Sequence, residues 1–343
     1  MKRYIFGFDA DHPENCARRL KAQSIDAVVI GDADDRTEDA LANAGLELYL
    51  CYGAHGLDAK TPASAQNAAG KPVKWFSSGC PNDRKLADRH LQNVLRKAKG
   101  LKTLRGILVD GARFASFAST EGRDAFFTCF CPKCMKKMDD MGLDAKAVRA
   151  SAARFMATKK IFDRDRENLT AWMDFRAACV QSYFERFAKS VHALRGDLIA
   201  GAFVFAPSLG RFVGQTAEAC RPLDAVAPML YRAYPHEDGP ACLGHEWAGL
   251  KALLGECAED FVNLTAPEIA VPAGTPEALL TGGFPPERVA DEVALAKKSL
   301  SPDQQLWPIL QIEDASLTET TRLAIESGAD AAGYFMFGQA DLP

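Results

Sequence analysis

The segment RGILVDGARF, residues 105–114, contains an unbroken apolar run from Ile107 to Val109 that ends abruptly at Asp110. A strand that is apolar on both faces is typical of a parallel sheet covered by helices on both sides. The segment therefore predicts a buried parallel strand that carries a carboxyl group at its C-terminal end.

Seven other segments share this near-continuous apolar character, and most are separated by stretches with helical periodicity. They are residues 4–10, 26–31, 46–53, 198–207, 224–234, 306–312 and 331–338. Eight strands that alternate with helices predict an α/β fold, a single (β/α)8 TIM barrel over residues 1–343. Long loops are expected after strands three, four and six, at the face where barrels build their sites: 54–104, 115–170 and 235–305.

The stretch 169–196 shows the expected helical pattern most clearly. Its apolar residues recur at steps of three and four and form one stripe, which we expect to face the barrel. The stripe consists of Trp172, Phe175, Cys179, Tyr183, Phe187, Val191 and Leu194, and Gly196 is the stop signal.

The composition is that of an ordinary globular protein, with 48% hydrophobic and 25% charged residues and a net charge of −4. The acidic balance argues against a nucleic-acid partner or an anionic membrane surface. No window approaches the ~20 apolar residues of a membrane span. Asp9, Asp11 and His12 interrupt the N-terminal segment before a signal-peptide core develops, so a cytoplasmic location with reduced thiols is expected. The oligomeric state stays open.

Cys129, Cys131 and Cys134 lie in the motif C-x-C-x₂-C. Thiols at this spacing are poor disulfide partners but good ligands for zinc, which prefers four tetrahedral ligands near 2.3 Å. The fourth ligand could be His90, Cys80 or another lone cysteine, and the alternative is a group of buried thiols without metal. Four thiolates would leave no open coordination position, so the zinc would be structural.

The cysteines resemble those of the family 42 glycoside hydrolases, which are β-galactosidases with a (β/α)8 barrel. That family has Cys-Pro-Asn after strand three and Cys-x-Cys-x₂-Cys after strand four, and the four cysteines bind a structural zinc. Cys80, Cys129, Cys131 and Cys134 match this pattern in order and in position relative to the predicted strands. The resemblance implies that Cys80 is the fourth ligand and that the zinc ties two long loops together.

Four strand motifs are similar to those of uncharacterised bacterial barrels that are classed as glycosyl hydrolases. The motifs are ILVDGARF (strand four), APMLYRAY (strand six), LWPILQI (strand seven) and DAAGYFMFG (strand eight), and they occur in the same order here. This resemblance implies a carbohydrate substrate.

Glycosidic hydrolysis needs two carboxyl groups on either side of the scissile bond, and in a barrel they should project from strand C-termini. Asp110 ends strand four and Glu313 follows strand seven, so we take them as the candidate catalytic pair. Arg113 could bind a substrate hydroxyl or depress the pKa of Asp110, unless the two form a structural ion pair. At strand seven, N-capping of a helix by Asp314 with Glu313 in solvent is the rival interpretation.

Further candidates for substrate binding lie in the expected rim segments. Gln311 could bind substrate or orient a carboxylate, and core packing is the alternative for the aromatic residues. The candidates are Asp9, Trp75, Phe76, Arg113, Tyr231, Arg232, Tyr234 and Gln311.

The catalytic residues of family 42 do not carry over. That family has an Asn-Glu pair at the end of strand four, where this chain has Val109-Asp110, and a nucleophilic Glu on strand seven. Either the acid has moved, with Glu121 as one replacement, or the protein is a non-catalytic, zinc-stapled barrel that binds a carbohydrate or a partner protein. Other chemistries lack their motifs: the sequence has no G-x-S-x-G, P-loop or H-E-x-x-H, and no predicted strand ends in lysine.

Overall fold

The computed structural model describes residues 1–58, 60–232, 241–336 and 338. Their parallel strands close into a barrel in the order β10-β11-β1-β2-β3-β6-β7-β8-β9, with β10 also paired to β8. The strands are β1 (Lys2–Phe6), β2 (Ala27–Ile30), β3 (Glu47–Gly53), β6 (Leu104–Asp110), β7 (Ile199–Phe205), β8 (Ala225–Met229), β9 (Gln305–Leu306), β10 (Ile309–Gln311) and β11 (Ala331–Phe335). The short β9 and β10 together occupy the seventh position, so the prediction of an eight-stranded parallel barrel is confirmed.

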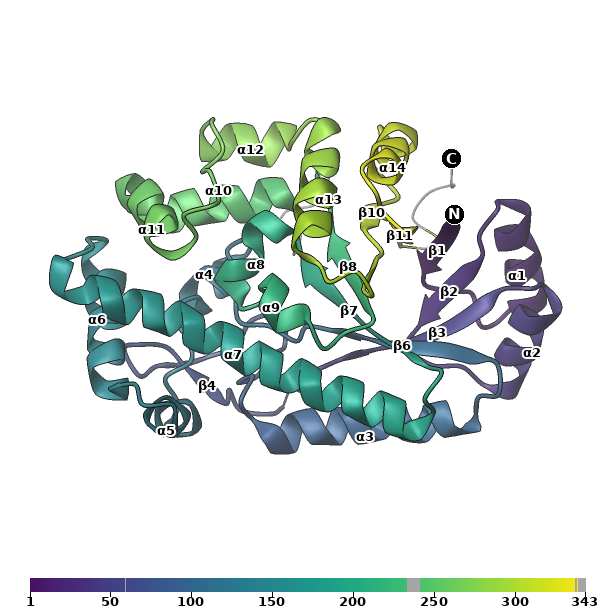
Figure 1. The fold of residues 1–343 in the computed structure, drawn as a ribbon, viewed down its shortest axis with the longest axis horizontal. Coiled ribbons are helices and arrows are strands. Elements are labelled where there is room, and N and C mark those ends of the chain that lie inside the picture. The colour runs from purple at the N-terminus through teal and green to yellow at the C-terminus, as the bar shows by residue number, and fades with distance from the viewer. Residues whose placement is uncertain (59, 233–240, 337, 339–343) are drawn as a thin grey trace.

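Helices surround this barrel (Figure 1). They are α1 (Pro13–Ala22), α2 (Asp35–Asn43), α3 (Arg84–Gly100), α4 (Thr120–Ala125), α5 (Pro132–Asp140), α6 (Ala145–Thr158), α7 (Asp163–Leu194), α8 (Pro207–Val213), α9 (Ala217–Cys220), α10 (Leu243–Leu254), α11 (Ala258–Thr265), α12 (Pro276–Gly282), α13 (Glu287–Ser299) and α14 (Leu317–Glu326). A small hairpin of β4 (Ala65–Gln66) and β5 (Pro72–Val73) lies in the connection after β3. In the described part of the chain, no helix is long and apolar enough to cross a membrane.

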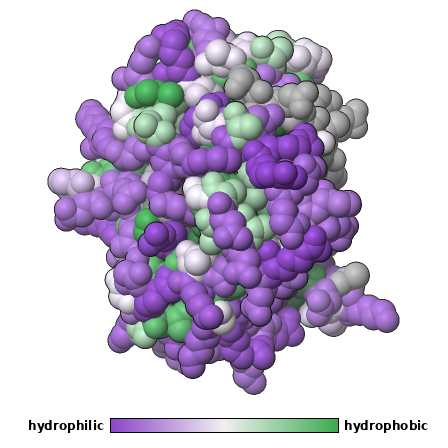
Figure 2. Space-filling view, turned by 90° about the vertical axis from the view of Figure 1, so that its right-hand side faces the viewer, coloured by the Kyte–Doolittle hydropathy of each residue, from purple (hydrophilic) through white to green (hydrophobic). Residues whose placement is uncertain are grey.

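The predicted helix 169–196 is part of α7, which is 32 residues long and ends immediately before Arg195 and Gly196. Its predicted apolar stripe is buried except for Leu194, which is half-buried. Figure 1 shows α7 running from the group formed by α4, α5 and α6 at one end of the molecule toward the barrel. On the opposite side, shown in Figure 2, hydrophobic residues form small areas between hydrophilic ones. Helices with one apolar face produce this surface.

Several strands end earlier in the structure than the sequence predicted. The expected strand 105–114 stops at Asp110, because Gly111 adopts φ +67 and turns the chain. Positive φ is accessible to glycine at little energetic cost. As a result, Arg113 belongs to a loop and not to β6.

Large side chains fill the N-terminal end of the barrel. On β1, alternation places Lys2, Tyr4 and Phe6 on one face. Tyr4 donates a hydrogen bond to the carbonyl oxygen of Trp307 (2.7 Å), and its ring lies where Gly333 has no side chain. Phe6, at the other end of β1, lines a cavity. The barrel is therefore packed at its N-terminal end and hollow at its C-terminal end.

We predict that Gly333→Ala destabilises the protein by roughly 1–3 kcal/mol, because the added methyl group would overlap the buried Tyr4 ring. Urea unfolding followed by circular dichroism measures this change. Gly100→Ala is the matched control, since a Cβ at the end of α3 meets no atom within 4 Å. Equal stability of the two variants would contradict this account of the barrel interior.

Candidate functional site

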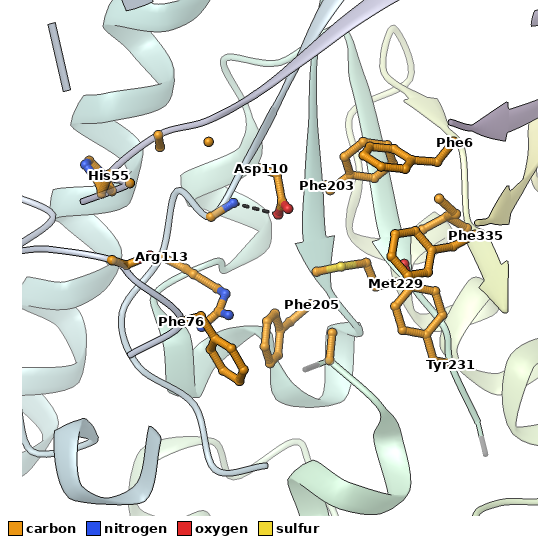
Figure 3. A pocket seen from close by; sticks show the side chains of 17 residues that line it. Phe6, His55, Phe76, Asp110, Arg113, Phe203, Phe205, Met229, Tyr231 and Phe335 are labelled. Atoms are coloured by element: carbon orange, nitrogen blue, oxygen red, sulfur yellow. Dashed lines mark hydrogen bonds between the residues drawn. The ribbon is translucent and has the colours of Figure 1, made fainter. Parts of the chain in front are cut away.

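A cavity of about 310 Å³ lies at the C-terminal end of the barrel. It is reached by the ends of β1, β3, β6, β7, β8, β10 and β11. Six of its 17 described lining residues are phenylalanine or tyrosine, and ligand pockets are commonly lined in this way. The aromatic residues are Phe6, Phe76, Phe203, Phe205, Tyr231 and Phe335, and Figure 3 shows them around Asp110 and Arg113.

Asp110 lies in the wall of this cavity at the end of β6. One carboxylate oxygen accepts a hydrogen bond from the backbone N–H of Gly111 (2.6 Å, Figure 3). Burial raises the pKa of the Asp110 carboxyl, and this effect exceeds the opposing influence of Arg113 and of the Gly111 N–H. Arg113 does lower the pKa of Asp110, as predicted, but desolvation is the larger effect and sets the net direction.

Arg113 projects into the cavity from the loop after β6. Its guanidinium carbon lies 4.6 Å from the centre of the Phe205 ring and 5.6 Å from that of Phe76. Nη1 donates to the carbonyl oxygen of Phe114 (3.0 Å). Among the described residues, Arg113 forms no ion pair with Asp110, so the alternative of a direct structural pair is not what the structure shows.

A second polar group follows β10. Nε2 of Gln311 donates to Oε2 of Glu313 (3.3 Å), which fits the predicted role of orienting a carboxylate. Neither residue lines the cavity with Asp110. Ile309 does line it, and alternation places Gln311 on the same face of β10. Glu313 lies beyond the strand end and is half-buried.

Arg232 and Asp314 pair with each other next to this group. Nε of Arg232 lies 2.7 Å from Oδ2 of Asp314, and Nη1 donates to the carbonyl oxygen of Phe284 (2.8 Å). Asp314 also accepts the N–H of Ser316, the residue that precedes α14. Arg232 is thus occupied by structural contacts and lies outside the cavity wall.

The remaining predicted residues differ in their placement. Tyr231 lines the cavity, and its ring is stacked on that of Phe335 at 5.4 Å. Asp9 is half-buried and accepts hydrogen bonds from the backbone of Asp11 and from His12 before α1. Trp75 is 1% exposed and does not line the cavity, whereas its neighbour Phe76 does.

Two of the rim predictions fall elsewhere. Glu121 is exposed in the first turn of α4, outside the cavity wall. Tyr234 lies outside the described residues.

Sequence reasoning missed several residues of the wall: Phe6, His55, Phe203, Phe205, Met229 and Phe335. Phe203 and Phe205 occupy alternating positions at the end of β7, a signal present in the sequence. His55 packs edge-on against Tyr183 at 5.1 Å, and burial lowers its pKa to about 3. It is therefore a neutral group at physiological pH.

Cys80, Cys129, Cys131 and Cys134 form a buried cluster, and their Sγ atoms all lie within 4.8 Å of one another. Cys80 Sγ lies 3.4–3.6 Å from each of the other three. Four buried cysteines in this arrangement could hold a metal ion. Cys80 comes from the connection after β3, Cys129 and Cys131 from the segment between α4 and α5, and Cys134 from the first turn of α5, so the cluster joins the connections after β3 and β6.

Asn82 supports the cluster from one side. Its Nδ2 lies 3.2 Å from Cys134 Sγ and 3.1 Å from Cys179 Sγ, and Lys137 Nζ donates to its Oδ1 (3.0 Å). Donors around ligating sulfurs orient them and offset their charge. Lys133 lies at the same place and pairs with Asp83 (2.7 Å).

Several solved structures have a similar fold. They include a β-galactosidase from the Antarctic haloarchaeon Halorubrum lacusprofundi (TM-score 0.62, 14% identity, 98% of this chain and 52% of that one). A GH42 β-galactosidase from G. stearothermophilus is also similar (TM-score 0.59, 10% identity, 98% of this chain and 51% of that one). So is the catalytic domain of β-amylase from Paenibacillus polymyxa (TM-score 0.54, 11% identity, 98% of this chain and 92% of that one).

The chain spans about half the length of the two β-galactosidases. At these identities the likeness shows the fold alone, so the resemblance to family 42 is supported at the level of the barrel. No family model and no curated protein matches the sequence.

We predict that Asp110→Asn stabilises the protein at pH 7. Since the pKa of Asp110 is raised by folding, the carboxyl contributes stability at low pH that is lost as the pH rises through its folded value. Asparagine keeps an acceptor for Gly111 without the buried charge. We expect Tm to rise by about 2–4 °C at pH 7 and to change little near pH 4, as measured by scanning calorimetry. A lower Tm at pH 7 would show that Asp110 is stabilising when charged.

Proposed function

We propose that this chain is a glycoside hydrolase that acts on a small oligosaccharide or glycoside, with residues 1–343 forming one barrel domain. The observation that carries the proposal is Asp110, a carboxyl group with a raised pKa in an aromatic cavity at the C-terminal ends of the barrel strands. Barrel enzymes place their catalytic residues at this face. The cavity volume of about 310 Å³ is at the small end for ligand pockets and suits one or two sugar rings.

In this proposal Asp110 is the general acid. Its raised pKa favours the protonated form, which a proton donor to the glycosidic oxygen requires. Glu313 is the second carboxylate, which attacks the anomeric carbon or activates the water that does so. The hydrogen bond from Gln311 orients it. A substrate would have to extend from the cavity to the end of β10 to contact both groups.

The second candidate function is a barrel that binds a carbohydrate without hydrolysing it. One observation favours it: among the described residues that line the cavity, Asp110 is the single carboxylate. Binding alone would use the aromatic wall and Arg113 and would not need Glu313.

Kinetics with aryl glycosides distinguish the two functions. We expect turnover of at least one 4-nitrophenyl glycoside from a panel of neutral and uronic sugars. Asp110→Asn should lower kcat by about 10²–10⁴-fold, and less for leaving groups of low pKa, because these need no proton. Glu313→Gln should lower kcat whatever the leaving group.

Glu121→Gln is the control for these kinetics, because Glu121 is exposed and outside the cavity wall. Unchanged kcat in both Asp110→Asn and Glu313→Gln would eliminate this catalytic pair. Ligand binding without turnover of any glycoside would favour the binding function.

We further propose that the cysteine cluster holds a structural zinc ion. Four sulfurs at about 2.3 Å from a tetrahedral zinc lie roughly 3.8 Å apart, and the distances of 3.4–3.6 Å from Cys80 are close to this. All four cysteines are buried, as a closed structural site requires. The ion would hold the two loops together and take no part in the reaction.

Elemental analysis of protein purified without chelator should find about one zinc per chain, as expected for a single four-cysteine site. Cys131→Ser should remove most of the zinc and lower Tm, because an incomplete site loses affinity. Cys220→Ser should keep the metal, since Cys220 is buried but is not a member of the cluster. Full zinc occupancy in Cys131→Ser would disprove the four-cysteine site.

A further inference from the structure

Arg113 carries a charge in the cavity wall that no described residue neutralises by direct contact. Arg113 is 7% exposed and forms no ion pair among the described residues. One of its five N–H donors bonds to the carbonyl oxygen of Phe114, and its buried Nε has no partner. A guanidinium stays protonated at neutral pH, so this positive charge is permanent.

Stacking on aromatic rings does not explain Arg113 by itself, because Arg176 is also stacked and buried. Arg176 lies 4.8–5.1 Å from the rings of Phe114, Phe126 and Trp172, and its Nη2 donates to the carbonyl oxygen of Ala115. Arg176 is enclosed by core side chains, whereas the Arg113 guanidinium faces an open cavity. Both guanidinium groups stack on aromatic rings, but of the two only that of Arg113 can contact a ligand in the cavity.

Burial lowers the pKa of Arg113, and two carboxyl groups oppose this through space, first Glu246 and then Asp110. Glu246 is fully buried, and its two oxygens accept hydrogen bonds from Ser116, Phe117, Ala118 and Ala241 (2.6–3.1 Å). Both carboxylate oxygens of Glu246, on α10, are therefore engaged by hydrogen bonds, three of them from the loop after β6. Asp110 carries a proton when it acts as the acid, and neutral His55 adds no charge. Among the described residues no carboxylate contacts Arg113 directly, and a ligand can supply that contact.

The geometry points to a carboxylate-bearing sugar, such as a uronic acid residue, as the ligand of this cavity, with Arg113 as the residue that binds its carboxylate. The inference deepens the proposed function and depends on it. A planar guanidinium can donate two parallel hydrogen bonds to a carboxylate. Phe205 and Phe76 lie beside the guanidinium and restrict its orientation, while the other aromatic residues of the wall can contact the sugar ring (Figure 3).

Calorimetric titration of the full chain tests this inference with four monosaccharides: D-glucuronate, D-galacturonate, D-glucose and D-galactose. We expect at least one uronate to bind about tenfold or more tightly than its neutral counterpart, the difference that a charge-assisted hydrogen bond supplies. Arg113→Met should abolish that preference while weak binding of the neutral sugar remains. Arg113→Lys should restore part of it, since the charge returns without the bidentate geometry.

Four other results of these titrations would contradict the inference. Equal or tighter binding of the neutral sugar to the wild-type protein would overturn the carboxylate inference and leave the proposed carbohydrate function standing. Binding of none of the four sugars at 10 mM would overturn both. Tighter binding of glucose 6-phosphate than of glucuronate would show that the site recognises phosphate instead. A uronate preference that survives in both Arg113 variants would exclude Arg113 as the carboxylate-binding residue.

Discussion

The closure of eight parallel strands into one ring is the constraint on which the rest of the structure depends. Parallel strands place all their C-terminal ends at one face, and alternation decides which side chains enter the ring. On β1, Lys2 lies over the rings of Tyr49 and Trp307, Tyr4 fills the space beside Gly333, and Phe6 reaches the cavity. The same rule brings Asp110 on β6 and Phe205 on β7 to the cavity wall. Strand direction and alternation thus place the packed side chains at one end of the barrel and the cavity at the other.

Desolvation sets the chemistry of that wall. It favours the neutral forms of Asp110 and His55, while Arg113 stays charged because its reference pKa is so high. Among the described residues, the wall therefore combines an acid whose pKa is raised, a neutral imidazole and the cation of Arg113. The raised pKa of Asp110 favours its protonated form, and protonated Asp110 would repel a second carboxylate less than ionised Asp110 would.

The sequence predicted the fold more fully than the site, for reasons that particular residues make clear. Buried parallel strands have continuous apolar runs, so all eight were detectable, but their ends depend on local turns such as that at Gly111. Local spacing identified three cysteines of the cluster. Cys80 lies about 50 residues earlier, and only the resemblance to family 42 identified it as the fourth. Tyr231 and Arg232 were predicted together, yet neighbouring side chains point to opposite sides, and Arg232 pairs with Asp314. Phe203 and Phe205 were missed because apolar residues at a strand end look like core.

The cysteine cluster is connected to the cavity through the backbone. Cys80 follows the segment that carries Phe76, where Leu57 and Gly79 donate N–H hydrogen bonds to the carbonyl oxygens of Ser77 and His55. The hairpin of β4 and β5 is bonded to the segment that carries Cys129, through Ala68 to Phe127 and Phe130 to Gln66. Phe76 and His55 both belong to the cavity wall. Since Phe76 lies against the Arg113 guanidinium, an ion that fixes Cys80 would also help to fix Arg113, the one permanent charge among the described residues of the cavity wall. Metal binding and ligand recognition are in this way parts of one arrangement, although no cysteine of the cluster touches the cavity.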